Sequence, residues 1–567
     1  MEPPDPIPNS EVKRSCADDT AVSGRGKVGS RLFFFAPKST FFCMGRRLFY
    51  YSFKQLQEWG LHIFFPIFFV LPLILLLSCE NKFFVPNEDI SDDDIDVIPD
   101  GDSNVIPDDD PETEVLTNLK VEENKKNSLS CRLTFSTADE KKTFVKYYSG
   151  SHSGYKIAEN EAKNDHYFFL WGMRENLDYT IEIYSDEETP ELLATTFFHS
   201  GFVPESVYPV HLVANEKESV MRGFVLFSQV VESGSPYASI VMVDNDGFPV
   251  WYYEHDVSGF SDLEDPAFIE QNNHIFVGVH KYPTMAEIPA EDGIEIDLEG
   301  NIVWKSPDIA GYYYSETGWH HDYKLLDDGT ILFIHAEYSE NLLTDRILNV
   351  DREYNELWNW GYLDSPGYFS EISCTDPNDE WCDWTHTNSV FTDSEKRFLY
   401  FNARCLGFYK MEMETKEIVW KFGENGDFTM LSDHLYPWPD YPHDPKIRED
   451  GKAVLFYDNA WSERNYSRVI EYIFDENSMT AEISFEFDGF SDERGWFAPA
   501  WGDADYLENG NIFVTKGMVN PPENSSLFEL TRDGRVVWEL YTEQNDEYNV
   551  IVYNADKFVP PLEFLDE

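Results

Sequence analysis

Short apolar runs separated by turn residues dominate this chain from residue 129 onward, and no stretch clearly follows the 3.6-residue period of a helix. Between residues 129 and 200 the runs are LSCRLTF, KTFVKYYS, HYFFLWGM, DYTIEIYS and ELLATTFFHS. Their length, their aromatic and β-branched content and their regular punctuation are typical of antiparallel strands. We therefore predict a small N-terminal β-sandwich over residues 128–204.

From residue 205 to residue 567 a longer pattern repeats. A short strand, a turn rich in Asp, Asn or Gly, and an apolar strand recur about every 60 residues, and the copies begin at Asp265, His321, His386, His443 and Gly502. A second repeated element, a strand, a polar turn and a strand, occurs six times and contains tryptophan in five copies. These are Trp251, Trp304, Trp358, Trp420 and Trp538.

A period of this size with several strands per unit is typical of a β-propeller. We predict an all-β fold in which the sandwich precedes a six-bladed propeller over residues 205–567. Each tryptophan is expected to pack between neighbouring blades. The closing segment, residues 550–564, is expected to finish the last sheet.

The N-terminal part differs in composition. Residues 63–77 are uncharged and mostly apolar, which is short for a membrane span and typical of a signal peptide. The segment ends at Cys79 in a sequence that resembles a bacterial lipobox, so residues 1–79 are predicted to be a lipoprotein signal with lipidation at Cys79. An uncleaved signal anchor is the alternative, and Met44 is a second candidate for the start of translation.

Residues 80–127 are predicted to be a disordered linker. Between Glu88 and Glu114 there are many acidic residues and no basic ones, so this stretch repels itself and lacks the apolar surface that folding requires. Such a segment suits a tether between a lipid anchor and a folded body.

The formal net charge of −62 excludes nucleic acid as a partner, because its phosphates would be repelled. The cysteines form no CxxC pair, so no zinc site is predicted. Cys374 and Cys382 bound a loop-like stretch whose spacing suits a local disulfide in an oxidising compartment, and two free thiols are the alternative.

Equivalent positions of successive blades lie around one axis, so His321, His386 and His443 are expected to converge. Arg404 follows His386 across one hairpin and reaches the same place. Three histidines are a possible metal site, but a guanidinium beside a metal ion is unfavourable. Arginine instead binds tetrahedral oxyanions, so the set predicts transfer of a sulfuryl or phosphoryl group with an imidazole nucleophile.

Three blocks then carry a family resemblance: GWHHDYKLLDDG, DWTHTNSV followed by NARCLGFYKMEMETKEIVWKFG, and YPHDPKIREDG with VLFYDNAW. Over about residues 130–567 the chain resembles the bacterial aryl-sulfate sulfotransferases. The resemblance implies transfer of a sulfuryl group from a phenolic sulfate ester to a phenolic acceptor. It implies a ping-pong mechanism through a sulfohistidine, without a nucleotide donor, cofactor or metal.

Carried over by position, the resemblance makes His443 the nucleophile and His386 and Arg404 the groups that bind the sulfuryl oxygens. One of His320 and His321 is a further catalytic histidine, and the repeat register favours His321. His320, Asn388 and Lys516 are then predicted to bind substrate. The family's propeller disulfide is assigned to Cys374 and Cys382. Several aromatic residues near the motifs are candidates for stacking on an aryl group, although most should be packing residues: Trp319, Tyr323, Trp384, Tyr441, Trp461, Trp496 and Trp501.

The family and the lipobox together imply a bacterial cell-envelope lipoprotein, periplasmic or on the surface, held to a membrane by lipid at Cys79. The sequence leaves the oligomeric state open. A non-catalytic propeller that binds a partner, and a metal-dependent enzyme that uses the three histidines as ligands, are the competing hypotheses.

Overall fold

The computed structural model describes residues 116–150, 152–231, 237–256, 261–281, 293–307, 319–339, 342–365, 369, 382–460, 464–489, 495–518, 525–543 and 549–565. The predicted signal segment, Cys79 and the acidic stretch lie outside these residues. Strands account for nearly all the regular structure that is described, and one turn of 3-10 helix, η1, spans Tyr362–Asp364. No helix in the described part of the chain has the length and apolar character needed to cross a membrane.

The N-terminal strands form two sheets, of order β1-β2-β5 and β36-β4-β3-β6-β7. Buried and partly exposed residues alternate along β2 and β6, so one face of each strand packs into a shared core. The bounds are β1 (Thr117–Glu123), β2 (Cys131–Lys141), β3 (Thr143–Ser149), β4 (His152–Ala158), β5 (Lys163–Leu170), β6 (Asp178–Ser185), β7 (Leu192–His199) and β36 (Glu563–Phe564).

Two of these strands, β1 and β4, were not predicted, and β36 was expected in the propeller rather than in the sandwich. β1 lies in the stretch that the sequence assigned to the linker, and it pairs with β2. Six of its seven residues are exposed, so this edge strand carries no apolar pattern by which it could be found. β4 is short and contains serine and glycine, which masks its strand character.

The remaining strands form six further sheets among the described residues, called propeller sheets 1 to 6 in chain order. In the first three, the members are β9 (Phe224–Val231), β10 (Tyr237–Asp244), β11 (Pro249–Asp256), β34 (Val550–Ile551) and β35 (Ala555–Phe558) in sheet 1; β12 (Ser261–Ile269), β13 (His274–Lys281), β14 (Gly293–Asp297) and β15 (Ile302–Lys305) in sheet 2; and β16 (Trp319–Leu325), β17 (Ile331–Ser339), β18 (Leu342–Val350), β19 (Glu356–Gly361) and β20 (Cys382–Asp383) in sheet 3.

The last three follow the same plan. Their members are β21 (Thr387–Thr392), β22 (Phe398–Ala403), β23 (Gly407–Glu412) and β24 (Glu417–Phe422) in sheet 4; β25 (Thr429–Met430), β26 (Pro442–Ile447), β27 (Ala453–Asp458), β28 (Arg468–Asp475) and β29 (Thr480–Phe487) in sheet 5; and β30 (Asp503–Tyr506), β31 (Ile512–Lys516), β32 (Ser526–Leu530), β33 (Val536–Thr542) and β8 (Val210–Asn215) in sheet 6.

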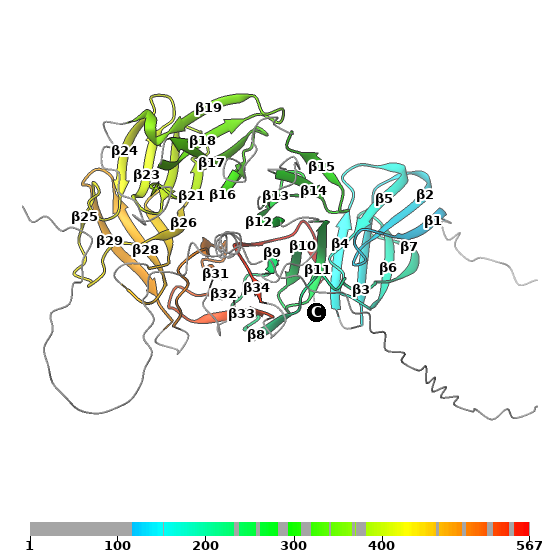
Figure 1. Cartoon of the computed structure of the whole chain (residues 1–567). Helices are drawn as coiled ribbons and strands as arrows, with labels where there is room; N and C mark the ends of the chain where they lie inside the picture. The colour runs from blue at the N-terminus through cyan, green and yellow to red at the C-terminus, as the bar shows by residue number, and fades with distance from the viewer. Residues whose placement is uncertain are drawn as a thin grey trace, which may run out of the picture. The chain divides into compact units, whose positions relative to one another are not determined.

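The innermost strands of these sheets contact one another in a closed series. β35, β12, β16, β21, β26 and β30 follow in this order, and β31 brings the series back to β35. Figure 1 shows β12, β16, β21, β26 and β31 toward the middle of the ring of sheets. Antiparallel sheets arranged in this way around a common centre define a β-propeller, so the predicted all-β class is confirmed.

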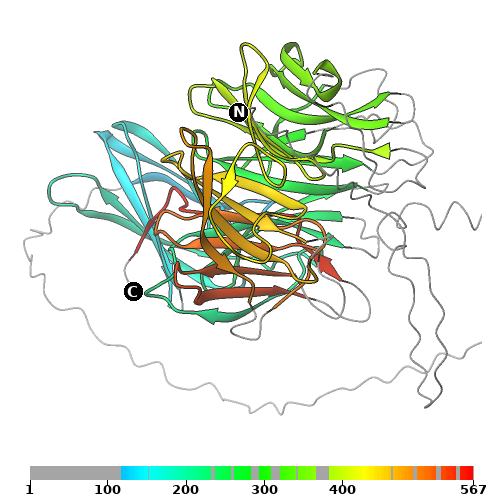
Figure 2. The ribbon, with the colours of Figure 1, turned by 90° about the vertical axis from the view of Figure 1, so that its left-hand side faces the viewer.

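The ring closes with strands from both ends of the repeat region. β8 pairs with β33 in sheet 6, and the two strands lie side by side in both views (Figure 1; Figure 2). At the other end of the chain, β35 pairs with β9 in sheet 1. The expectation that residues 550–564 finish the last sheet is therefore wrong, because β8 occupies that edge. A strand's own pattern does not tell which of two exposed sheet edges it will join.

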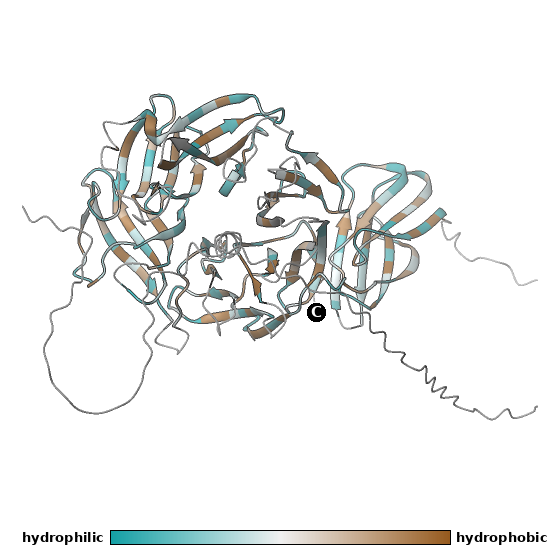
Figure 3. Cartoon of the chain, in the orientation of Figure 1, coloured by the Kyte–Doolittle hydropathy of each residue, from teal (hydrophilic) through white to brown (hydrophobic). Residues whose placement is uncertain are grey.

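The tryptophans join neighbouring sheets, as predicted. Trp251 Nε1 donates to Leu298 O at 2.8 Å, and Trp538 Nε1 donates to Asn245 O at 2.8 Å, in each case from one sheet to the next. Trp304 and Trp358 make the corresponding bonds. Figure 3 shows apolar residues in all the sheets, and strands such as β27 and β31 are buried along their whole length, because both of their faces pack against adjacent sheets.

Candidate active site

Irregular backbone at the start of the innermost strands positions the site residues. The pairing register shifts between Trp319 and Tyr323 in β16, and between His443 and Lys446 in β26. His321 has φ of 63° and His386 has φ of 46°, values that non-glycine residues rarely adopt. Such bulges redirect a side chain at a strand end, and here they occur where the histidines turn to the centre.

Three histidines from three different sheets lie against one another. The ring centroids of His321 and His386 are 4.9 Å apart, and those of His321 and His443 are 6.2 Å apart. The shared repeat register therefore predicted correctly that these residues, more than fifty positions apart in the chain, lie close together. The structure brings together the three predicted histidines.

His443 is buried and held in one tautomer. Its Nδ1 lies 2.9 Å from the carbonyl oxygen of Gly502, and a carbonyl only accepts, so Nδ1 carries the proton. Nε2 is then left with its lone pair. Burial, together with the nearby charge of Arg404, lowers the pKa of His443 to about 4, so the ring is neutral at neutral pH.

Gly502 cannot carry a side chain at this position. Its φ is 92°, and a Cβ would lie 2.5 Å from the Tyr457 ring. The glycine in the fifth copy of the repeat, where other copies have aspartate or histidine, therefore allows its carbonyl to reach His443.

His386 and Arg404 form a second side of the site. Asp383 Oδ2 lies 2.5 Å from His386 Nδ1 and fixes the orientation of that ring. The backbone N–H of Arg404 donates to His386 O at 3.1 Å, and the guanidinium lies 5.3 Å from the centre of the Tyr441 ring. Arg404 Nε is buried and has no hydrogen-bond partner within the described residues, so it is available to an anionic ligand.

The adjacent residues His320 and His321 take different places. His321 faces His386 and His443, whereas His320 lies behind it, with Nδ1 2.8 Å from His321 Nδ1 and Nε2 3.1 Å from Asp345 Oδ1. Burial and the nearby imidazoles and Arg404 lower the pKa of His321 well below its usual value, so its ring is neutral. The geometry thus agrees with the preference for His321 over His320.

Tyr553 completes the site and was missed by sequence reasoning. Its hydroxyl donates to His321 O at 3.2 Å and lies 3.4 Å from His443 Nε2. Its backbone carbonyl accepts from Gly502 N–H at 3.2 Å. Tyr553 precedes β35, the strand whose sheet was assigned incorrectly, so no register argument could place it. Asp345 and Asp383 were also missed, because no repeat position marks them.

Buried carboxylates and lysines from several innermost strands lie next to the histidines in the chain. Lys324 contacts Asp322 at 2.8 Å, and Lys446 contacts Asp444 at 2.7 Å. Asn554 donates to Asp265 at 2.8 Å. Burial, with its neighbouring carboxylates, raises the pKa of Asp265 to about 8, because a further negative charge here is unfavourable. These groups tie the innermost strands together beside the site.

The other predicted residues occupy distinct places. Asn388 donates to Pro442 O at 3.0 Å and accepts from Asn402 at 2.7 Å, so its amide joins β21 to the residue before His443. Lys516 lies at the end of β31, with Nζ 5.7 Å from the centre of the Trp496 ring rather than against the histidines. Their binding of substrate stays a prediction.

The cysteine predictions are only partly covered by the structure. Cys382 is disulfide-bonded, and Cys131 and Cys405 are free. Cys374 lies outside the described residues, so its pairing with Cys382 stays a prediction.

Most of the candidate aryl-stacking residues are in the core. Trp319, Tyr323, Trp384 and Trp496 are buried. Tyr441 lies beside Arg404, and Trp501 contacts Tyr553 with ring centroids 5.3 Å apart. These two are therefore the aromatic candidates next to the site, and Trp461 lies outside the described residues.

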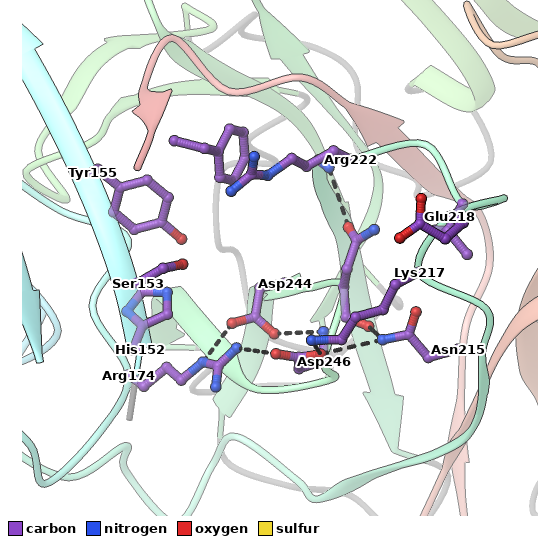
Figure 4. A pocket seen from close by; sticks show the side chains of 14 residues that line it. His152, Ser153, Tyr155, Arg174, Asn215, Lys217, Glu218, Arg222, Asp244 and Asp246 are labelled. Atoms are coloured by element: carbon purple, nitrogen blue, oxygen red, sulfur yellow. Dashed lines mark hydrogen bonds and ion pairs between the residues drawn. The ribbon is translucent and has the colours of Figure 1, made fainter. Parts of the chain in front are cut away.

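A separate pocket of about 310 Å³ lies between the sandwich and propeller sheet 1 (Figure 4). Arg174 of the sandwich joins Asp244 at 2.6 Å and Asp246 at 2.7 Å across it. Burial lowers the pKa of His152 in its wall to about 4. Arg174 is thus paired with two carboxylates, and these ion pairs join the sandwich to sheet 1.

No group of three or more His, Cys, Asp or Glu side chains in the described ranges has the arrangement of a metal site. The histidine cluster combines a neutral imidazole whose Nε2 carries a lone pair, a second imidazole held by a carboxylate, and an arginine with an unused donor. Chemically, such a combination suits the binding of a tetrahedral oxyanion next to a nucleophile.

The fold and the site together define a β-propeller protein with a histidine and arginine centre. The chain belongs to the arylsulfotransferase (ASST) family, whose model matches residues 210–554, more than half of the sequence. No curated protein matches the chain significantly.

The solved structures that resemble the chain do so only distantly, in both sequence and fold. The β-propeller domain of Cps50 (Swd1) from Myceliophteria thermophila is 11% identical, with a TM-score of 0.33; the matched region spans 60% of this chain and 88% of that domain's chain. BamB from Moraxella catarrhalis is 9% identical, with a TM-score of 0.26; the matched region spans 68% of this chain and 95% of the BamB chain. Neither likeness is close enough to bear on function.

Proposed function

We propose that this protein is an aryl-sulfate sulfotransferase that moves a sulfuryl group from a phenolic sulfate ester to a phenol through a sulfated His443. One observation carries the proposal. The Gly502 carbonyl fixes the proton of His443 on Nδ1, and the free Nε2 lies in the same cluster as His321, His386 and Arg404. Membership of the arylsulfotransferase family supports it.

In the first half-reaction the Nε2 lone pair of His443 attacks the sulfur of the donor. The bond between sulfur and the aryl oxygen breaks, its electron pair leaves with the aryl oxygen, and a proton converts the phenolate to phenol. The sulfuryl group is then bonded to Nε2, and the positive charge on the ring is stabilised by the Nδ1–H bond to Gly502.

The negative charge on the sulfuryl oxygens is stabilised by Arg404 and His386. The unused Nε of Arg404 gives a hydrogen bond that is already oriented, and buried donors of this kind cost no reorganisation when the transition state forms. Asp383 holds His386 in place for the same task.

In the second half-reaction an acceptor phenol attacks the same sulfur from the side opposite Nε2. The bond between nitrogen and sulfur breaks, and its electron pair returns to Nε2. The phenol loses its proton to a base in the site, so His443 is regenerated and the complete cycle is neutral in protons.

We also propose that the protein acts at a bacterial cell envelope, with a lipid on Cys79 and the acidic stretch as a spacer. The composition of residues 63–114 supports this location. Metabolic labelling with a radioactive fatty acid, compared between the wild type and Cys79→Ala, tests it. Equal labelling of the two proteins would contradict lipidation at Cys79.

The test of the function uses the purified protein, 4-nitrophenyl sulfate as donor and phenol as acceptor. We expect nitrophenolate release that depends on phenol, persists with a chelator and disappears in His443→Asn. Mass spectrometry after incubation with donor alone should find the sulfuryl group on His443. Release that is equally fast without phenol would indicate a sulfatase, and no release with any of several phenols would overturn the proposal.

A further inference from the structure

The adjacent residues His320 and His321 form a contact that the sulfuryl-transfer chemistry of His443 does not use. Their Nδ1 atoms are 2.8 Å apart, so one of them donates a proton to the other. The rings are nearly perpendicular, with an interplanar angle of 84°, and only His321 lies against His386. His320 is thus coupled to the site through His321.

The far nitrogen of His320 faces a carboxylate. Asp345 Oδ1 lies 3.1 Å from His320 Nε2, which is an ion-pair distance although the contact is not an aligned hydrogen bond. Asp345 Oδ2 accepts from Thr385 Oγ1 at 2.6 Å and from Thr387 N–H at 2.7 Å. Although burial opposes ionisation, His320 and these donors lower the pKa of Asp345, so it carries a fixed negative charge.

The geometry allows two proton arrangements. With one proton on each ring, His320 keeps its proton on Nε2 beside Asp345, His321 donates from Nδ1, and His321 Nε2 has a free lone pair. When the pair gains one proton, His320 carries it as an imidazolium next to Asp345 and donates from Nδ1. His321 then accepts at Nδ1 and holds a proton on Nε2.

We propose that Asp345, His320 and His321 form a proton relay for the sulfuryl transfer. His321 Nε2 gives its proton to the aryl oxygen that leaves in the first half-reaction, and the positive charge on the pair disappears. In the second half-reaction His321 Nε2 takes the proton of the acceptor phenol, and the charge returns to His320. This inference rests on the proposed function, with His321 as the catalytic residue and His320 and Asp345 as positioning residues.

The charges around the pair favour this assignment. His386, His443 and Arg404 face His321, and they make a positive charge on that ring unfavourable. His335 is the imidazole that faces His320, and burial lowers its pKa to about 4, so it adds no charge at neutral pH. Among these groups Asp345 is the anion, so the extra proton is most stable on His320, one ring away from the reacting atoms.

The competing acid is His386, which has its own carboxylate, Asp383, at 2.5 Å. The sulfuryl oxygens require a hydrogen-bond donor that stays in place, and Asp383 holds the His386 ring for that task, whereas an acid and base must exchange a proton in each cycle. The experiment therefore includes Asp383→Asn beside His320→Asn and Asp345→Asn.

The test compares two donors that differ in their need for an acid. Phenolate, with a conjugate-acid pKa near the value of about 10 for tyrosine, leaves poorly without a proton, whereas nitrophenolate leaves without one. For His320→Asn and Asp345→Asn we expect kcat/KM with phenyl sulfate to fall about 100-fold or more, the usual size of general acid catalysis, and kcat/KM with 4-nitrophenyl sulfate to change little. His320→Asn keeps an amide near the position of Nδ1. The amide can hold the His321 ring in place but cannot pass a proton to it, so this variant separates the loss of proton transfer from the loss of ring orientation.

The exposed pair His199 and Asp178 on the sandwich, 2.8 Å apart, supplies the matched control. His199→Asn and Asp178→Asn should leave both donors unaffected. If Asp345→Asn proves unstable in thermal unfolding, His320→Asn decides the question.

Equal losses with both donors would show a structural role and overturn the relay, as would unchanged turnover of phenyl sulfate. A loss confined to phenyl sulfate in Asp383→Asn, but not in the other two, would assign the acid to His386. A wild-type protein that releases nothing from either donor would overturn the proposed function itself.

Discussion

At the scale of single residues, the site depends on backbone that few side chains accept. His321 and His386 both have positive φ; a register shift includes His321, and another begins just after His386. The bulge at His321 brings Nδ1 of His320 within 2.8 Å of Nδ1 of its neighbour His321. A regular strand would place the two side chains on opposite faces, where this contact could not form.

The lowered pKa of His443 predicts how activity depends on pH. The nucleophile must be unprotonated, and its pKa of about 4 keeps it so throughout the range above that value. We expect the acid limb of kcat/KM for 4-nitrophenyl sulfate to lie well below pH 6.5, the usual pKa of histidine. Steady-state rates between pH 4 and 8, with circular dichroism at each pH to follow folding, check this. Half-loss of activity near pH 6.5 in folded protein would contradict it.

Asp265 gives a prediction about stability. Burial raises its pKa to about 8 in the folded state, from 3.8, so the folded protein binds more protons than the unfolded chain between these values. Stability from this group is therefore present at low pH and is lost as the pH rises toward 8. Asp265→Asn removes the titration, keeps the shape and tolerates the φ of 49°.

We expect Asp265→Asn to raise the free energy of unfolding at pH 8 by about 1–3 kcal/mol, and to raise it less at pH 5, since the aspartate is already protonated there. Thermal unfolding at the two pH values measures the difference. A lower melting temperature at both would mean that ionised Asp265 is stabilised by Lys324.

Sequence reasoning placed the central histidines and the arginine of the site together from their shared repeat register. His321, His386, His443 and Arg404 lie at or one hairpin from the same position in successive copies, so the period alone places them together. Tyr553, Asp345 and Asp383 contribute through contacts that follow no period. Their partners are fixed by the packing of whole sheets, which a linear pattern does not encode.

At the scale of elements, five of the six propeller sheets carry one repeated tryptophan that packs toward the next sheet, and its position was predictable because it ends a recurring polar turn and strand. The indole N–H bonds to a neighbouring carbonyl were not predictable. Four of the five repeated tryptophans make such a bond. Trp420 is the exception, because its Nε1 is buried without a partner within the described residues.

This difference gives a matched pair of substitutions. Trp251 and Trp420 are almost fully buried, and Trp→Phe removes similar ring volume from each, but only Trp251→Phe breaks a hydrogen bond, to Leu298 O. We expect Trp251→Phe to lower the free energy of unfolding by about 1–2 kcal/mol more than Trp420→Phe, because the carbonyl is left unsatisfied. Urea unfolding followed by circular dichroism measures both. Equal losses would show that ring volume alone matters.

At the scale of the whole molecule, strands from the two ends of the repeat region close the ring. β8 completes sheet 6, β35 completes sheet 1, and β36 adds an edge to the sandwich. The period in the sequence predicted the repeated sheets. It did not predict the closure, because both strands are atypical copies whose places depend on which edges remain open after the other sheets form.

The net charge of −62 acts on the molecule as a whole and opposes the entry of an anionic donor. A sulfate ester carries a negative charge, whereas a phenol acceptor is neutral, so salt should affect the two half-reactions differently. The Debye length falls from about 30 Å at 0.01 M salt to about 8 Å at 0.15 M, which screens the outer acidic surface more than the buried contacts of Arg404.

We therefore expect kcat/KM for 4-nitrophenyl sulfate to rise several-fold between these salt concentrations, while kcat/KM for phenol, which reports the second half-reaction, stays constant. Steady-state kinetics with each substrate varied in turn separates the two values, since a ping-pong mechanism assigns one to each half-reaction. A donor kcat/KM that falls with added salt would show that the local field of Arg404 and His386 extends beyond the acidic surface and attracts the donor. A change in both values would point to an effect of salt on the fold rather than on the encounter.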